Sequence, residues 1–182
     1  MQRDQHTIIA FHEAGHAVMA MACGFRVTKI SIDPNEIGMG HVCWDEPSNP
    51  DRDSRRRSVL VALSGWAADF IHLKKNASGT DVDDPQGHFS DQRQAREHLS
   101  ALNENDLFQA YLCLAMHFLG RDDVWEVVDE LASFMLRCRS LDGQAILTRL
   151  AECCPKIAYQ EWLRLEDFKR AVNKMGPDWD LS

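Results

Sequence analysis

The stretch DQHTIIAFHEAGHAVMAM, residues 4–21, predicts the first helix of the fold and carries the residues with candidate chemistry. Its apolar residues recur at helical spacing and Asp4 stands where an N-cap belongs, so we expect an amphipathic helix that ends near Gly24. Within this helix His12 and His16 are four residues apart and therefore lie on the same face, one turn apart. Both imidazoles can then reach a single metal ion.

The pattern His12-Glu13-Ala14-Gly15-His16 is typical of zinc hydrolases. Zinc held by two imidazoles and one carboxylate keeps a fourth position for water, whose pKa falls to about 7 on the metal. Glu13 stands beside both histidines and is the candidate general base, which takes a proton from this water and passes it to the leaving amine. The pattern therefore predicts Zn²⁺ as the cofactor and peptide-bond hydrolysis as the reaction.

Spacing alone does not choose the third zinc ligand. Asp91 and His98 can share one helix face, and His88 comes shortly before Asp91, so a site could gather in this region. The residues that remain open as third ligand are Asp33, Glu36, His41, Asp69, Asp81, Asp83, Asp84, His88, Asp91 and His98.

The rest of the chain predicts two short strands and a series of helices. The alternating, β-branched residues 26–33 and the short segment 40–44 predict strands that can pair as a hairpin. Ser90 is a suitable N-cap for the third of the predicted helices. The helices, the motif helix included, are predicted at 4–21, 58–73, 91–103, 105–119, 122–139, 142–153 and 156–175.

These elements predict an α+β, mostly α fold: the motif helix with a small β-hairpin or sheet, followed by a helical bundle. At 182 residues the chain is expected to form a single domain, residues 1–182. Its motif-bearing half is 1–95 and its helical half is 96–182.

Composition excludes several classes of partner. The net charge of -8 argues against nucleic acid, because phosphate binding needs a basic face. No apolar run approaches the roughly eighteen residues of a membrane-spanning helix, and no signal-peptide core is present. We therefore expect a soluble, cytoplasmic chain without membrane contact. The six cysteines show no disulfide or C-x-x-C spacing, which predicts buried free thiols.

The run FHEAGHAV, residues 11–18, followed by VTKISI, residues 27–32, resembles the peptidase domain of the FtsH family of zinc metalloproteases. Two more segments are similar in order. LSGWAAD, residues 63–69, matches the family's Gly-Gly-Arg-Ala-Ala-Glu-Glu helix, and GHFSDQRQA, residues 87–95, matches its Gly-Ala-x-Asn-Asp-Leu-x-x-Ala-Thr segment. The resemblance is specific over residues 5–95 and faint beyond them.

The resemblance implies a role for each matching residue. His12, His16 and Asp91 would be the zinc ligands and Glu13 the general base. Asp69 would lie behind the ligands, where a carboxylate commonly orients a ligand histidine. It stands where the family has Glu, so its reach is shorter by one methylene.

The resemblance also implies how substrate binds. Residues 40–44 would receive a polypeptide as an added β-strand, and main-chain pairing of this kind reads little sequence. We therefore expect unfolded or flexible polypeptides as substrates. The family is hexameric when joined to its ATPase, which leaves homo-oligomerisation open here.

Departures from the family define the alternatives. No Walker A pattern and none of the family's membrane helices occur, so we expect an endopeptidase that works without ATP or beside a separate ATPase. Ser64 and Trp66 replace Gly and Arg, and an acidic insertion at 81–84 precedes Asp91. The alternative is a zinc-binding but inactive or weakly active module for protein binding or regulation. A helical domain with an accidental motif is the third reading.

Overall fold

The computed structural model describes residues 4–34, 39–76, 85–142 and 144–175. It is mostly helical with one small antiparallel sheet, so the predicted fold class is confirmed. The elements in chain order are α1 (Gln5–Ala22), β1 (Val27–Ser31), β2 (His41–Trp44), α2 (Arg52–Lys75), α3 (Pro85–Leu102), the 3-10 helix η1 (Asn105–Leu107), α4 (Phe108–Leu119), α5 (Asp122–Cys138), β3 (Ser140–Leu141), α6 (Gln144–Cys153) and α7 (Tyr159–Met175).

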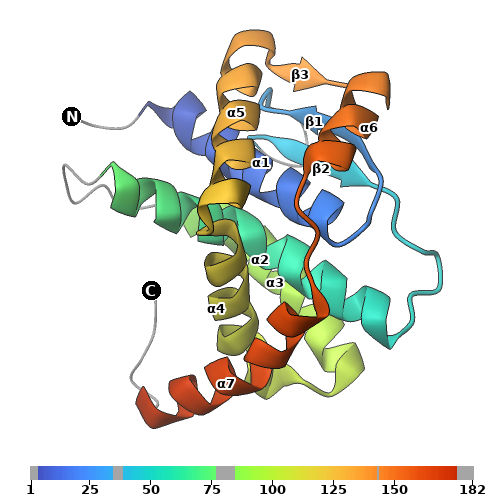
Figure 1. The fold of residues 1–182 in the computed structure, drawn as a ribbon, viewed down its shortest axis with the longest axis vertical. Helices are drawn as coiled ribbons and strands as arrows, with labels where there is room; N and C mark the ends of the chain where they lie inside the picture. Colours follow the sequence, from blue (N-terminus) through green and yellow to red (C-terminus); the bar gives the residue numbers. More distant parts are fainter. Residues whose placement is uncertain (1–3, 35–38, 77–84, 143, 176–182) are drawn as a thin grey trace.

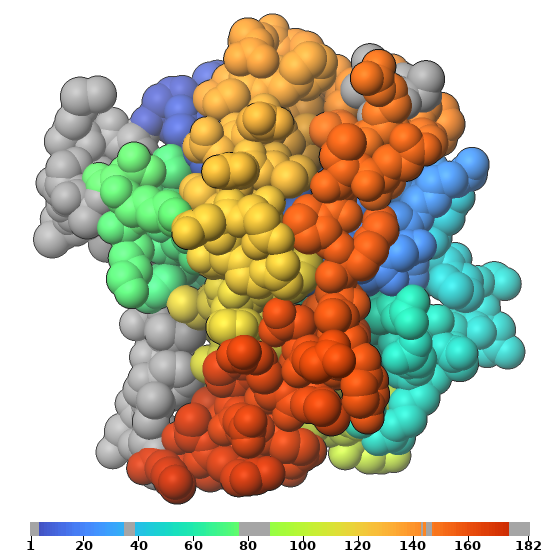
Figure 2. All heavy atoms as spheres, in the orientation of Figure 1, coloured from blue at the N-terminus to red at the C-terminus, as the bar shows by residue number. Residues whose placement is uncertain are grey.

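Helix α1 forms the centre of the molecule. It packs against α2, α5 and the sheet, and nearly all of its residues from Ile9 onward are buried. Figure 1 shows the strands and α6 at one end and α7 at the other. In Figure 2, α5 and the chain from α6 to α7 cover the viewed face, so that α1 is largely hidden. The motif from His12 to His16 is thus carried by a core helix.

The sheet has the strand order β2-β1-β3, and both pairings are antiparallel. Ile30 of β1 pairs with Val42 of β2 on one side and with Leu141 of β3 on the other. The predicted hairpin of β1 and β2 is confirmed, whereas the short strand β3 was not predicted. Strand β2 is left at the edge of the sheet.

Two helices begin earlier than predicted. Helix α2 begins at Arg52 rather than near residue 58, and the side chain of its N-cap Asp51 accepts a hydrogen bond from Ser54 N at 2.8 Å. Helix α3 begins at Pro85, so Ser90 lies inside the helix and is not its N-cap. Proline is favoured at the first position of a helix because it has no N–H to leave unpaired. Asp91 therefore does not lie in a first turn.

The cysteines are free thiols, as predicted, but they are not all buried. Cys23 and Cys154 are buried, whereas Cys43, Cys138 and Cys153 are exposed. The exposed positions correct the expectation of a uniformly buried set. In the ranges that the structure describes, no helix is both long and apolar enough to cross a membrane.

Candidate metal centre

The site begins with the close packing of α1 on α2. A Cβ atom on Gly15 would lie 2.5 Å from Ala68 Cβ and 2.7 Å from Ser64 O, so only glycine allows this approach. The neighbouring residues of α1, His12 and His16, then face α2 and α3. Gly15 therefore determines how closely His12 and His16 of α1 approach α2.

Three side-chain atoms from α1 and α3 converge at one point. His12 Nε2 and His16 Nε2 are 3.1 Å apart, and Asp91 Oδ2 lies 3.0 Å from the former and 3.2 Å from the latter. Zinc binds nitrogen and oxygen ligands at about 2.0–2.2 Å, so tetrahedral ligands should be about 3.3 Å apart. The three separations are close to this value.

The histidine tautomers favour a cation at the same point. His12 Nδ1 lies 2.8 Å from Asp69 Oδ2, and His16 Nδ1 lies 2.7 Å from the backbone oxygen of Val61. These acceptors place the proton on Nδ1 and leave a lone pair on each Nε2. Two lone pairs that face each other at 3.1 Å repel unless a cation or a proton lies between them. The donor set therefore fits zinc.

A glycine leaves room for such an ion. A Cβ atom on Gly65 of α2 would lie 2.6 Å from His12 Nε2 and closer still to His16 Nε2. Any side chain at this position would occupy the space beside the two ring nitrogens. Gly65 therefore keeps open the place where a metal would bind.

The two carboxylates make this point favourable for positive charge. Burial lowers the pKa of His12, but the charges and hydrogen bonds of Asp69 and Asp91 outweigh it and raise that pKa well above 6.5. Burial likewise lowers the pKa of His16, and Asp91 outweighs it. Burial raises the pKa of Asp91, but the two histidines bring it far below its ordinary value.

Glu13 lies beside the converging atoms, at the side of the sheet. A Cβ atom on Gly40, just before β2, would lie 2.6 Å from Glu13 Oε1 and 2.8 Å from Glu13 Cγ. The absence of a side chain at Gly40 lets the strand approach the glutamate. Burial raises the pKa of Glu13, while His12 and His16 act in the opposite direction without reversing the rise. A carboxyl group with a raised pKa is suited to accept and return a proton.

These side chains open into a cleft of about 400 Å³. The lining residues from α1 and β2 are both apolar and polar, and those from α3 are polar. The residues that line it are Gln5, Ile8, Ile9, His12, Glu13, His16, Met39, Gly40, His41, Val42, Trp44, Asp69, His88, Ser90, Asp91 and Gln94. The candidate site is thus open to a ligand and lies against the edge strand.

The structure separates Asp91 from most of its rivals as third ligand. Asp33 pairs with Arg139 at 2.6 Å, and His98 lies 3.7 Å from Glu46. His41 lines the cleft but is not part of the converging group. Asp69 and His88 lie behind His12 and form a second group with it. The remaining rivals, Glu36, Asp81, Asp83 and Asp84, are outside the described residues.

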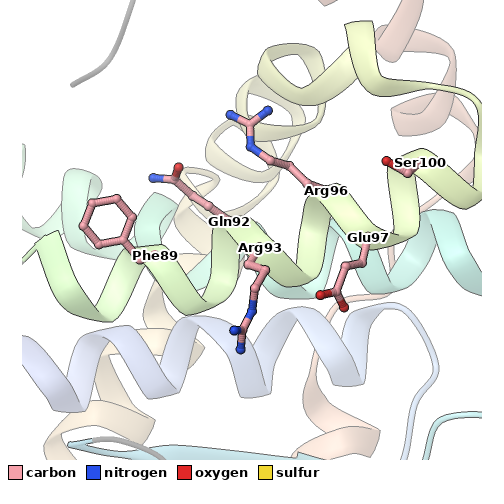
Figure 3. A pocket seen from close by; sticks show the side chains of 6 residues that line it. All are labelled: Phe89, Gln92, Arg93, Arg96, Glu97 and Ser100. Carbon is pink, nitrogen blue, oxygen red and sulfur yellow. The ribbon is translucent and has the colours of Figure 1, made fainter.

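A larger depression of about 580 Å³ lies elsewhere, on the outside of α3. Figure 3 shows that its side chains, from Phe89 to Ser100, spread along this one helix without converging on a point. It contains none of the histidines or aspartates of the site. The smaller cleft is therefore the candidate for chemistry.

Comparison with known proteins finds a peptidase family that is similar to part of this chain. A family model described as peptidase family M41 matches residues 1–86. The predicted resemblance to the FtsH-family peptidase domain is confirmed over this part of the chain. Over 83 residues, the chain is 36% identical to the ATP-dependent zinc metalloprotease FtsH of Methylibium petroleiphilum. That match covers 42% of this chain and 13% of the FtsH protein.

The M41 match includes α1 but ends at residue 86, before Asp91 of α3. His12, Glu13, His16 and Asp69 lie within residues 1–86, whereas Asp91 lies beyond them. Sequence reasoning named all five of these residues. It missed the contact of His88 with Asp69 and the spatial roles of Gly40 and Gly65, because no local pattern in the sequence points to them.

Proposed function

We propose that this chain is a zinc-dependent endopeptidase that hydrolyses unfolded or flexible polypeptides without ATP. The observation that carries the proposal is the convergence of His12 Nε2, His16 Nε2 and Asp91 Oδ2 beside Glu13. His16 and Asp91 are 75 residues apart in the chain, so their meeting is a property of the fold. The match to a metallopeptidase family supports the same chemistry.

In this proposal His12, His16 and Asp91 hold the metal, and Asp69 and the backbone oxygen of Val61 orient the two imidazoles. Zinc, when bound, supplies Lewis acidity that activates water and polarises a carbonyl group. Glu13 takes the proton of the attacking water and returns it to the leaving amine. Burial raises the pKa of Glu13, which favours the first of these transfers.

We propose that substrate binds along β2. This strand is at the edge of the sheet and its residues His41, Val42 and Trp44 line the cleft. An extended polypeptide can add to such an edge through main-chain hydrogen bonds. Because these bonds are available only to an extended chain, a folded protein should be a poor substrate.

The decisive test is Glu13→Gln, with zinc content and cleavage of casein measured on the same samples. The parent should contain about one zinc per chain and cleave casein, because three protein ligands leave one open position. Glu13→Gln should retain the zinc and lose at least about 100-fold of the activity, since general-base catalysis contributes about 10²–10⁴-fold. A variant as active as the parent would refute the proposed mechanism.

The same assay decides between the peptidase and its alternatives. Parent protein that binds zinc without cleaving casein would support a module for protein binding or regulation. His12→Ala, His16→Ala and Asp91→Ala should each weaken zinc binding strongly. His98→Ala is the matched control, because His98 belongs to α3 but lies near Glu46 rather than at the site. Failure of the parent to bind added zinc would refute the metal centre altogether.

A further inference from the structure

One carboxylate behind the converging atoms is shared by two imidazoles. Asp69 Oδ2 lies 2.8 Å from His12 Nδ1 and 3.0 Å from His88 Nε2. The other oxygen of Asp69, Oδ1, is buried and has no hydrogen-bond partner among the described residues. The orientation of the carboxylate toward His12 therefore depends on a single oxygen that His88 also contacts.

His88 is itself held by ring contacts. Its side chain is buried, and its ring stacks on Trp66 with 5.5 Å between centroids and an interplanar angle of 28°. It also stacks on His12, with 5.7 Å between centroids and an angle of 16°. Trp66 and Asp69 are one turn apart on α2. That helix therefore offers the imidazole of His88 both a stacking surface and an acceptor.

A second donor would hold the carboxylate of Asp69 in one orientation. The terminal torsion of an aspartate is broad, so one hydrogen bond leaves its carboxylate loosely oriented. A second donor on the same oxygen restricts that torsion. Carboxylates that orient a metal-binding histidine commonly account for 10–100-fold in metal affinity. Two positions at which this chain departs from the family pattern, Trp66 and Asp69, both contact His88.

We propose that His88 is a positioning residue of the metal site, which donates from Nε2 to Asp69 and thereby holds His12 with its Nε2 toward the metal. This inference rests on the proposed function, because the orientation of His12 matters to catalysis only if His12 binds the metal. His88 acts through Asp69 and does not take part in the chemical step.

A second metal bound by His12, Asp69 and His88 is the rival explanation, since their ligand atoms lie within 4.8 Å of one another. The separations of 2.8 and 3.0 Å are those of N–H···O hydrogen bonds. A second metal would also require His12 Nδ1 to lose its proton while Nε2 binds the first. We therefore favour the hydrogen bonds.

The test compares His88→Phe, which keeps a ring but removes the donor, with His88→Gln, whose amide nitrogen can replace Nε2. Zinc affinity is measured by competition with a chromophoric chelator, and ligand geometry by the visible spectrum of the Co²⁺-loaded protein. His88→Phe should weaken zinc binding about 10–100-fold and alter the Co²⁺ spectrum. His88→Gln should stay close to the parent in both. His98→Phe is the matched control on the same helix and should leave both unchanged.

A double-mutant cycle separates positioning from a general effect on folding. In an Asp69→Ala background His88→Phe should add almost nothing, because its effect passes through the missing carboxylate. The full loss in that background would overturn the proposal. If His88→Phe does not fold, as judged by circular dichroism, His88→Ala carries the same prediction because it also lacks the donor.

The outcomes distinguish this inference from the function on which it rests. A parent that binds zinc and His88 variants that bind it equally well would overturn the role of His88 alone. Two metals per chain in the parent and one in His88→Phe would establish the rival second site. A parent that binds no zinc would overturn both proposals.

Discussion

At the scale of single residues, the site depends as much on space as on ligands. Gly65 carries no chemical group, yet any Cβ atom there would crowd His12 Nε2 and His16 Nε2. The two nitrogens can approach a common ion only while this space stays open. A glycine inside a helix usually costs about 0.5–1 kcal/mol relative to alanine, so the cost at Gly65 is offset by what it leaves room for.

We therefore expect Gly65→Ala to abolish zinc binding. The added methyl group would fill the space beside both ring nitrogens, and side chains forced into packed sites cost about 1–3 kcal/mol in stability. The measurement is the increase in melting temperature on adding zinc, because a ligand that binds only the folded state raises it. The parent should show the increase and Gly65→Ala should not.

Gly120→Ala is the matched control for this experiment. Its Cβ atom would lie 2.8 Å from Met116 O at the end of α4, away from the ring nitrogens. The variant should be less stable but should still gain stability from zinc. A zinc-dependent increase of equal size in Gly65→Ala and in the parent would contradict the role given to Gly65.

Also at this scale, the sequence predicts ligands unequally well. His12, Glu13 and His16 follow from one helical period, because that period alone places the two histidines on one face. Asp91 is separated from His16 by 75 residues, and no local pattern relates positions so far apart. It was identified only by resemblance to a family. The structure brings it to the histidines, and its role as a ligand remains a prediction.

At the scale of elements, the contact of α1 with α2 supports the whole site. Gly15 lets the two helices approach, and α2 then presents Gly65 and Asp69 to the histidines of α1. Helix packing at this distance requires small residues on both sides, and Ala68 is the partner of Gly15. Gly15 and Ala68, which are not candidate metal ligands, thus determine how α1 is positioned on α2.

We expect Gly15→Ala to lower the free energy of unfolding by about 1–3 kcal/mol, the usual cost of an overpacked core. The measurement is urea denaturation of the metal-free protein. Ala95→Gly, which removes a buried methyl group from α3 instead of adding one to α1, is a useful comparison. A Gly15→Ala variant as stable as the parent would show that α1 and α2 can separate at little cost.

The sequence predicts an element well when its apolar pattern extends over many residues. It predicts poorly an element that forms only through contacts with distant parts of the chain. The long helices and the β1–β2 hairpin follow from apolar spacing. Strand β3 has two residues, Ser140–Leu141, which is too short for any period, and it exists through its pairing with β1. The start of α3 was misplaced because Ser90 is as good an N-cap in sequence as Pro85 is a first residue.

At the scale of the whole molecule, a buried glutamate joins the part of the chain that carries the site to the helical part that follows. Glu104, between α3 and η1, is 6% exposed and accepts hydrogen bonds from Arg52 and Arg56 of α2 and, at 3.0 Å, from Tyr111 of α4. The sequence predicts a single domain of residues 1–182. Such a domain requires contacts between its two halves, and the hydrogen bonds of Glu104 are contacts of this kind.

Glu104 should make the stability of the protein depend on acid. Burial raises the pKa of Glu104, but the hydrogen bonds from Arg56 and Tyr111 outweigh it and hold that pKa below its ordinary 4.5. The folded state therefore binds this proton less readily than the unfolded state does. The stabilisation is fully present above the unfolded pKa and is lost as the pH falls through the folded pKa.

We therefore expect Glu104→Gln to be less stable than the parent by roughly 1–3 kcal/mol near neutral pH, and the difference to shrink as the pH falls below 4.5. Urea denaturation of both proteins in the metal-free state, between about pH 7 and pH 3, measures it. Glu97→Gln, at an exposed position of α3, should change stability little at any pH. A deficit of Glu104→Gln that stays constant down to the lowest pH would mean that Glu104 contributes packing rather than charge.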